Sequence, residues 1–343
     1  MIETIELAPG YRIPRIVRGG WQLAGGHGEV EAERALADMR AFVDAGLDTF
    51  DCADIYTGVE ALYGRFNAGE RAAGRRTLQV HTKFVPDYDD LARVDAAYVR
   101  RIVTRSAERL ALPRLHLVQF HWWDYAVSGM LETARHLDTL RREGLIAHLG
   151  GTNFDTPHTA QMLDAGIPLV SMQVQYSLLD RRPERALVPL ARERGFHLLC
   201  YGALAGGFLT DAWLGRPEPT DVSNRSLIKY KLVIDDFGGW AAFQALLREL
   251  RGIADRHRTS IAAVATRWVL DRERVAATIV GARYASHLAD TLAVFALRLD
   301  DEDLARLAPL LAAHPGPEGD TYALERDKVG RHGRIMKYNL NKE

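Results

Sequence analysis

The sequence predicts an α/β fold, a closed (β/α)₈ barrel in which each of eight parallel strands is followed by a helix. Short apolar runs alternate with longer amphipathic segments along the 343 residues. This alternation is typical of a parallel sheet with right-handed crossovers. An open doubly wound sheet is the alternative, but it usually carries a G-x-G-x-x-G turn after its first strand. The glycines of RGGWQLAGGHGE lack that spacing, which favours the barrel.

The elements follow from the pattern of apolar residues. The turn-like segment LAPGYRIP predicts a small N-terminal hairpin. In the first helical segment, Ala35, Met39 and Phe42 share one face, and Gly46 ends the helix. The runs expected to form the eight strands are residues 15–23, 49–54, 78–84, 115–123, 146–153, 169–177, 197–204 and 276–282. Further helices are expected near 59–70, 93–111 and 129–143, and in most of the later connections.

Two segments exceed a minimal barrel. A long connection follows the seventh strand, at about residues 205–258, and contains one predicted helix, WAAFQALLRELRGIADRH. A helix near 301–313 is followed by a C-terminal tail, residues 315–343. We expect residues 1–343 to form a single barrel domain with these additions. Loops that follow barrel strands lie on the face where active sites are built, so a long loop there is often functional.

Composition limits the classes of function. The net charge of −1 implies no strongly basic face for a nucleic acid. No apolar run approaches the roughly 20 residues of a membrane helix, and the first residues do not resemble a signal peptide. The two cysteines, Cys52 and Cys200, form no CxxC motif, so neither a metal site nor a disulfide framework is expected. A reducing, cytoplasmic setting is the simplest interpretation. Oligomeric state stays open.

Polar side chains stand at the ends of consecutive predicted strands. Asp51 lies late in the second strand with Tyr56 just beyond it, Lys83 lies late in the third, and His121 lies late in the fourth. In a barrel these ends meet at one rim, and Asp51 can pair with Lys83 because their strands are adjacent. For any one of these residues, a structural ion pair or a structural histidine is an equally good interpretation. The combination of four complementary groups favours a catalytic site.

These four groups suit carbonyl reduction. A phenol has a pKa of about 10, and a nearby ammonium lowers it by stabilising the phenolate. Lys83, held charged by Asp51, would act in this way on Tyr56, which would then give a proton to a carbonyl oxygen as hydride reaches the carbon. His121 would hydrogen-bond the same oxygen and set its direction. A Schiff-base aldolase using Lys83 is a different possibility, but pairing with Asp51 would keep the lysine protonated.

With these motifs the sequence resembles the aldo-keto reductase superfamily over essentially its whole length. The resemblance is carried by DTFDCADIY, VHTKF and LVQFHWW, in this order. It implies a (β/α)₈ barrel, NADPH or less often NADH as the cofactor, and a catalytic tetrad of Asp51, Tyr56, Lys83 and His121.

The resemblance also implies a set of cofactor-binding residues. In GGTNF, Thr152 and Asn153 would bind the nicotinamide carboxamide together with Gln173, and Tyr201 would stack on the nicotinamide ring. Gly202, Leu204, Ala205 and Gly206 of CYGALAGGFL would approach the pyrophosphate. Gly20 and Trp21 would lie beside cofactor and substrate.

The segment IVGARYASHLADTLAVF resembles the part of the family that binds the adenosine end, but it departs from the usual pattern. The residues expected there are Gly281, Arg283, His287, Asp290 and Thr291. Arg283 would pair with a ribose 2′-phosphate, because a guanidinium matches phosphate geometry. We therefore expect NADPH, with NADH as the alternative because Asp290 is anionic.

Aromatic residues near the strand ends would line the substrate pocket. Trp21, Phe84 and Trp122 are the residues expected there, with Trp123 and Tyr88 as further candidates, and one of the two adjacent tryptophans is expected in the core. The partner is expected to be a small carbonyl compound or a sugar. Three functions stay open: an NAD(P)-dependent reductase, an aldose dehydrogenase running in the oxidising direction, and a regulatory module like the potassium-channel β subunits.

Overall fold

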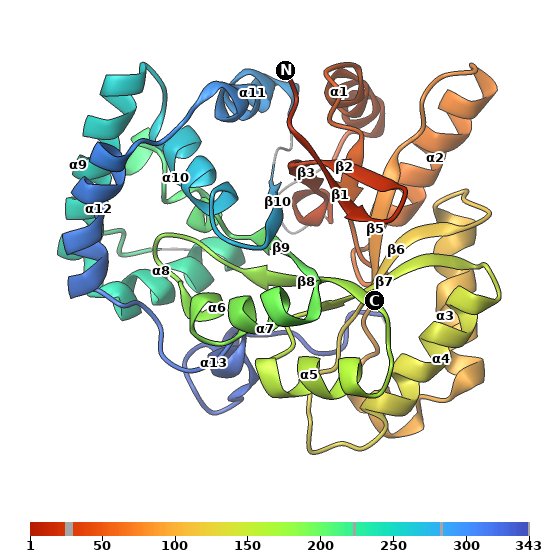
Figure 1. Cartoon of the computed structure of the whole chain (residues 1–343). Helices are drawn as coiled ribbons and strands as arrows, with labels where there is room; N and C mark the ends of the chain where they lie inside the picture. Colours follow the sequence, from red (N-terminus) through yellow and green to blue (C-terminus); the bar gives the residue numbers. More distant parts are fainter. Residues whose placement is uncertain (25–29, 222–223, 282–283, 342–343) are drawn as a thin grey trace.

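The barrel is closed by eight parallel strands in the order β10-β3-β4-β5-β6-β7-β8-β9. The computed structural model describes residues 1–24, 30–221, 224–281 and 284–341. The barrel strands are β3 (Ile16–Gly19), β4 (Thr49–Asp51), β5 (Gln79–Phe84), β6 (Leu115–Phe120), β7 (Ile146–Thr152), β8 (Leu169–Gln175), β9 (His197–Tyr201) and β10 (Val275–Val280). Figure 1 shows the helices arranged around these strands. The predicted (β/α)₈ class is therefore confirmed.

An antiparallel hairpin precedes the barrel, as predicted. It consists of β1 (Thr4–Ala8) and β2 (Tyr11–Pro14) and lies across one end of the barrel in Figure 1. Leu7, Tyr11 and Ile13 of the hairpin join an apolar cluster with residues of the barrel strands, among them Leu117 and Leu199. The hairpin thus closes the end at which the strands begin, and the opposite end is left for polar side chains.

Helices cover the outside of the barrel. They are α1 (Ala32–Asp44), α2 (Val59–Ala72), α3 (Ala96–Arg109), α4 (Met130–Arg142), α5 (Thr156–Asp164), α6 (Arg182–Arg185), α7 (Leu187–Arg194), α8 (Arg225–Phe237), α9 (Gly239–His257), α10 (Ile261–Leu270), α11 (Leu288–Ala296), α12 (Asp301–Ala313) and α13 (Ala323–Arg326). Asp95, Asp155, Ser260 and Asp300 cap four of them by accepting a hydrogen bond from a backbone amide in the first turn. Such a cap is worth about 1 kcal/mol. None of the helices that the structure describes is both long and apolar enough to cross a membrane.

The structure differs from the expected elements in several places, and the strands expected at 49–54, 115–123 and 197–204 end at Asp51, Phe120 and Tyr201. The first barrel strand ends at Gly19, and the short 3₁₀ helix η1 (Trp21–Leu23) follows. The connection after β9 contains α8 in addition to the predicted helix. Its apolar residues Tyr230, Val233, Ile234 and Phe237 are buried at helical spacing, and Asn224 caps its start. The C-terminal tail also contains α13 and the 3₁₀ helix η6 (Gly333–Ile335).

A histidine lies inside the barrel beneath the hairpin. His81 of β5 is fully buried and shares a hydrogen bond of 3.0 Å with the hydroxyl of Tyr11. The ring of Tyr11 also stacks on His148, with 4.8 Å between the ring centroids. Burial, with smaller contributions from neighbouring positive groups, lowers the pKa of His81 from 6.5 to about 3. This histidine is therefore neutral in the folded protein over most of the pH range.

The low pKa of His81 predicts a loss of stability in acid. The unfolded chain binds a proton at His81 below pH 6.5, whereas the folded chain does so only near pH 3, so stability falls as the pH drops between these values. Between pH 7.5 and pH 4.5 we expect His81→Gln to lose about 3 kcal/mol less stability than the wild type. Urea unfolding at the two pH values measures this, with His287→Gln, at an exposed position, as the control. An identical pH dependence in His81→Gln would contradict the assignment.

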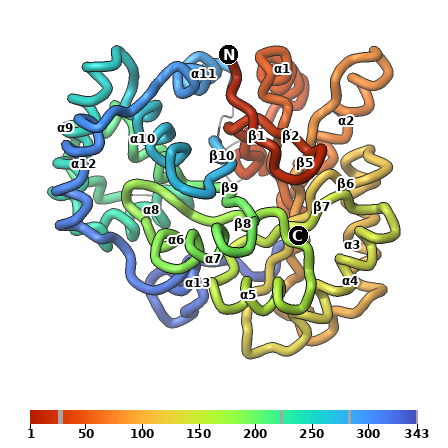
Figure 2. Tube along the Cα trace, in the orientation of Figure 1, coloured from red at the N-terminus to blue at the C-terminus, as the bar shows by residue number. Residues whose placement is uncertain are grey.

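The C-terminal tail is anchored to the rim at which the strands end. Arg182 forms a buried ion-pair cluster with Asp180 and with Glu325 of the tail. Further along, the backbone amides of Leu340 and Asn341 both donate to Asp87, in the loop after β5. Figure 2 shows the dark blue trace leaving α12, passing through α13 and returning towards the middle of the barrel. The tail therefore lies over the rim at which the strands end.

Removing Arg182 tests this anchor. Arg182→Met leaves Asp180 and Glu325 buried without their main cation, so we expect a loss of about 3–5 kcal/mol in the free energy of unfolding. The matched control is Arg192→Met, which breaks an exposed ion pair with Glu273 and should cost less than about 1 kcal/mol. Urea denaturation of both variants measures the difference. Equal losses would show that the cluster does not hold the tail.

Candidate active site

The predicted pair of Asp51 and Lys83 forms inside the barrel. Lys83 Nζ donates to Asp51 Oδ2 at 2.6 Å and to the carbonyl oxygen of Cys52 at 2.8 Å. The neighbouring strands β4 and β5 carry them, with Asp51 in register with His81 and Lys83 two residues further on the same face. Burial lowers the pKa of Lys83, but the charge of Asp51, its hydrogen bond to the ammonium and the neighbouring Tyr56 and Cys52 together raise the pKa above its ordinary value. The ammonium therefore stays charged.

Two amide side chains support the same carboxylate. Gln119 Nε2 and Gln173 Nε2 both donate to Asp51 Oδ1, at 3.0 and 2.6 Å, and Gln173 also donates to Gln119 Oε1. Both oxygens of Asp51 are thus bonded. Gln173 was predicted as a nicotinamide ligand, and in this structure its amide is bound to Asp51. Gln119 was not predicted, although its position two residues before His121 places it on the same inward face.

Tyr56 lies beside this network, in the loop after β4. Its ring centroid is 5.1 Å from Lys83 Nζ and 5.1 Å from the ring of Trp21. Burial raises the pKa of Tyr56 by more than the charge of Lys83 lowers it, so the net change is upward. The expected lowering of the pKa is therefore not found. Tyr56 is a protonated phenol, and Lys83 reduces the cost of forming its anion without removing that cost.

His121 follows β6 and faces the same space. Its Nδ1 lies 2.9 Å from the carbonyl oxygen of Thr152. A carbonyl can only accept, so we assign the ring proton to Nδ1. Burial lowers the pKa of His121 to about 3, which keeps the ring neutral. Its Nε2 is buried and has no hydrogen-bond partner among the described residues, so this nitrogen presents a lone pair to the site.

The residues predicted for the nicotinamide end lie together beside His121. Asn153 has a positive φ of 60° and follows Thr152, whose carbonyl binds His121. Tyr201 donates its hydroxyl proton to Asn153 Oδ1 at 2.8 Å, and the backbone amide of Asn153 donates to the carbonyl of Gln173. Tyr201 thus bonds only to the oxygen of the Asn153 side chain. The amide nitrogen of this side chain has no hydrogen-bond partner among the described residues.

The glycines predicted for cofactor binding have structural reasons of their own. A Cβ at Gly20 would lie 2.7 Å from the carbonyl oxygen of Asp51. Gly202 and Gly206 have φ values of 76° and 67°, and a Cβ at either would strike the ring of Tyr230 on α8. Leu204 and Ala205 lie between them in the same turn. Close packing of α8 therefore explains the small residues without invoking the pyrophosphate.

The region predicted for the adenosine end follows β10. His287 and Asp290 are exposed, and a Cβ at Gly281 would meet the side chain of Gln22. Thr291 is buried and its hydroxyl donates to the backbone carbonyl of His287. Thr291 therefore offers no free hydroxyl to a ligand. The predicted 2′-phosphate partner, Arg283, lies outside the residues that the structure describes.

Two of the predicted substrate-pocket residues are in the core. Phe84 packs against Tyr98 of α3, and Trp122 is fully buried with its indole NH donating to the carbonyl of Val127. Phe84 follows the inward-facing Lys83, so the pleat of the strand turns it towards the helices. Both residues are thus packed in the core, and their role in the substrate pocket stays a prediction. Trp21 does lie against Tyr56.

Other aromatic side chains surround His121 in their place. The ring of Trp123 lies 4.4 Å from that of His121, and Tyr322 of the tail lies 5.8 Å from it. Tyr322 has a positive φ of 61°, a conformation that costs energy in a bulky residue and is common at functional sites. Trp123 was a further candidate from the sequence. Tyr322 was missed, because no pattern in the tail indicates that it reaches the rim.

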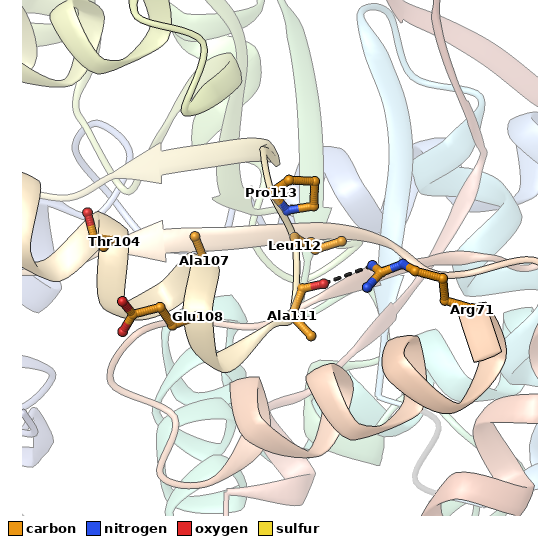
Figure 3. Close-up of a pocket in the computed structure, with 7 residues that line it drawn as sticks. All are labelled: Arg71, Thr104, Ala107, Glu108, Ala111, Leu112 and Pro113. Carbon is orange, nitrogen blue, oxygen red and sulfur yellow. Dashed lines mark hydrogen bonds between the residues drawn. The ribbon is translucent and has the colours of Figure 1, made fainter.

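Two further features of the structure have no assigned part in this site. Asp54, left without a role by the sequence, accepts a hydrogen bond from the backbone amide of Val85. A hollow of about 580 Å³ lies on the outside of the barrel between α2 and α3 (Figure 3). It is lined by Arg71, Thr104, Ala107, Glu108, Ala111, Leu112 and Pro113. These residues include none of the predicted site residues.

Comparisons with known proteins agree with this fold. The model of the aldo/keto reductase family matches residues 15–312. Flagellar radial spoke protein 5 of Chlamydomonas reinhardtii is 28% identical over 64% of this chain, which spans 49% of that longer protein. NADH-specific methylglyoxal reductase of Escherichia coli is 23% identical over 88% of the chain and 95% of its own length.

A solved structure, the glycerol dehydrogenase of Gluconobacter oxydans, has the same architecture. It superposes with a TM-score of 0.76 and 26% sequence identity, covering 93% of this chain and 97% of that one. The family match spans the whole barrel, from the residue before β3 to the end of α12. The chain therefore belongs to the aldo/keto reductase family.

Proposed function

We propose that the chain is an NAD(P)-dependent oxidoreductase that interconverts a small carbonyl compound and the corresponding alcohol. The observation that carries the proposal is the position of the Lys83 ammonium, held by Asp51 at 2.6 Å and lying 5.1 Å from the ring of Tyr56. A bound nicotinamide nucleotide would supply the hydride. The residues of the chain would bind and orient the substrate and move the proton.

Tyr56 is the proposed proton donor in reduction and the proton acceptor in oxidation. Its pKa lies above the ordinary value, so the hydroxyl is protonated at neutral pH and ready to donate. As the proton leaves, the ammonium of Lys83 stabilises the phenolate that forms. Asp51 holds Lys83, and the amides of Gln119 and Gln173 hold Asp51, so this charge is fixed in place before the reaction.

The groups around His121 fit a nicotinamide. The amide nitrogen of Asn153, which has no partner among the described residues, can donate to a carboxamide oxygen, and the ring of Tyr201 beside it would stack on the nicotinamide. We propose NADPH as the cofactor, bound with the help of Thr152, Gln173, Gly281, His287 and Asp290. NADH is the alternative, and one relative is named for NADH specificity. For Thr291, packing inside its helix favours a structural role instead.

Oxidation of an alcohol is the second candidate, and the histidine favours it. With its proton on Nδ1, His121 accepts at Nε2, and an alcohol hydroxyl can donate to that lone pair whereas a carbonyl oxygen cannot. The tautomer therefore suits the alcohol better than the carbonyl. The solved relative is named as a glycerol dehydrogenase, which also acts on an alcohol. In the reducing direction with this tautomer of His121, Tyr56 would be the group that donates a hydrogen bond, and then the proton, to the carbonyl oxygen of the substrate.

A regulatory role is less well supported. The radial spoke relative shows by its name that a similar chain can belong to an assembly. A buried, hydrogen-bonded Asp51–Lys83 pair beside a tyrosine is expensive to maintain without chemical use, which favours catalysis. Cys52 and Cys200 are both buried and free, which supports the proposed reducing, cytoplasmic setting. The proposed substrate is a small-molecule carbonyl compound or a sugar.

Tyr56→Phe tests the proposed reaction. Removing the hydroxyl should lower kcat by about 10²–10⁴-fold and leave nucleotide affinity within about threefold, because the proton donor is lost and the ring remains. Turnover is followed by nucleotide absorbance with aldehydes, ketones, aldoses and alcohols, in both directions and with both nucleotides. Tyr98→Phe removes a hydroxyl outside the site and should retain turnover. Undiminished turnover in Tyr56→Phe would reject the assignment.

Arg283→Ala tests the choice of cofactor. If the guanidinium binds the 2′-phosphate, its loss should weaken NADPH binding by about tenfold or more and leave NADH binding nearly unchanged. Binding is measured by quenching of protein fluorescence on titration with each nucleotide. Arg248→Ala, an exposed arginine of α9, is the control. Equal weakening of both nucleotides would show that Arg283 does not read the 2′-phosphate.

A further inference from the structure

Lys229 of α8 reaches towards the site from a helix that the sequence did not predict. Its side chain is 16% exposed. The ammonium lies over three tyrosine rings, 5.1 Å from the centroid of Tyr201, 5.7 Å from Tyr230 and 5.8 Å from Tyr322. Tyr322 in turn lies 5.8 Å from the ring of His121. The lysine is therefore one aromatic side chain away from the histidine of the proposed reaction.

The ammonium of Lys229 has no hydrogen-bond partner in the part of the chain that the structure describes. Its nearest carboxylate oxygen is Glu325 Oε1, at 3.9 Å, which is beyond hydrogen-bond distance. Both oxygens of Glu325 already accept hydrogen bonds from Arg182. Burial lowers the pKa of Lys229, although the charge of Glu325 opposes this. A mostly buried ammonium in this condition gains free energy when an anionic oxygen binds to it.

A second cation on the tail adds to the positive charge. Arg326 donates to the carbonyls of Trp122, Trp123 and Asn153, and it has no carboxylate within 4 Å among the described residues. Among the described residues, the cations of Arg182, Lys229 and Arg326 have only the carboxylates of Asp180 and Glu325 within 4 Å. This excess of positive charge attracts an anion to the side of the site that the tail covers.

We propose that Lys229 binds an anionic oxygen of the substrate, a carboxylate or a phosphate, while the carbonyl or hydroxyl of that substrate lies at Tyr56 and His121. The proposal rests on the proposed oxidoreductase function and adds a substrate class to it. A phosphate of the nucleotide is the other source of anionic oxygen. Tyr322 favours the substrate, because its ring lies 5.8 Å from the ammonium of Lys229 and 5.8 Å from the ring of His121.

The experiment compares two substrates that differ in one charge, 4-carboxybenzaldehyde and methyl 4-formylbenzoate. The wild type should show the higher kcat/KM for the carboxylate, mainly through a lower KM. In Lys229→Met the ratio of the two kcat/KM values, carboxylate over ester, should fall at least tenfold. Lys229→Arg retains a cation and should recover much of the ratio. Lys231→Met, in the same helix but with an ammonium already paired to Glu218 and Asp235, should leave the ratio unchanged.

The possible failures can be told apart. An unchanged ratio in a folded Lys229→Met overturns the proposal. An unchanged ratio with weakened nucleotide binding also overturns it and assigns Lys229 to the cofactor. If no carbonyl or alcohol is turned over, the proposed function fails, and the subsite is tested separately by fluorescence titration with benzoate and benzamide. Tighter binding of benzoate to the wild type than to Lys229→Met supports the subsite, and equal binding rejects it.

Discussion

The ion pair between Asp51 and Lys83 is the interaction on which the catalytic face depends. Two opposite charges inside a barrel lose their hydration, and this loss is offset only when the remaining hydrogen-bonding positions are filled. Here Gln119 and Gln173 donate hydrogen bonds to the second oxygen of Asp51, and the carbonyl of Cys52 accepts another hydrogen bond from Lys83. The pair therefore fixes charge and direction across four strands, and the phenol of Tyr56 is placed against it.

The two ends of the barrel are closed by different means. The hairpin inserts apolar side chains and Tyr11 where the strands begin, and His81 is kept neutral there by burial. At the other end the tail is attached through ion pairs and backbone hydrogen bonds, so the side chains beneath it remain polar. The family match stops at residue 312, and the tail beyond that point brings Tyr322, Glu325 and Arg326 to the rim.

The sequence predicted side chains well where strand order alone decides their position. Asp51 and Lys83 meet because consecutive strands are neighbours in a barrel, and Thr152, Asn153, Gln173 and Tyr201 gather for the same reason. The sequence says less where orientation decides. Phe84 and Trp122 were expected in the pocket because they are aromatic, but the pleat turns Phe84 to the helices, and Trp122 is fully buried. Gln119 was overlooked because an amide in an apolar run carries no signal of its own.

The sequence by itself determined the barrel, the hairpin and the groups that follow the second, third and fourth strands, because the alternation of apolar runs and the identity of strand-end residues are local properties. Only the tertiary structure decided which ring nitrogen of His121 carries the proton and that burial affects the pKa of Tyr56 more than Lys83 does. It also decided that Lys229 and the tail meet at the rim. These properties depend on contacts between residues far apart in the chain, and such contacts leave no periodic pattern in the sequence.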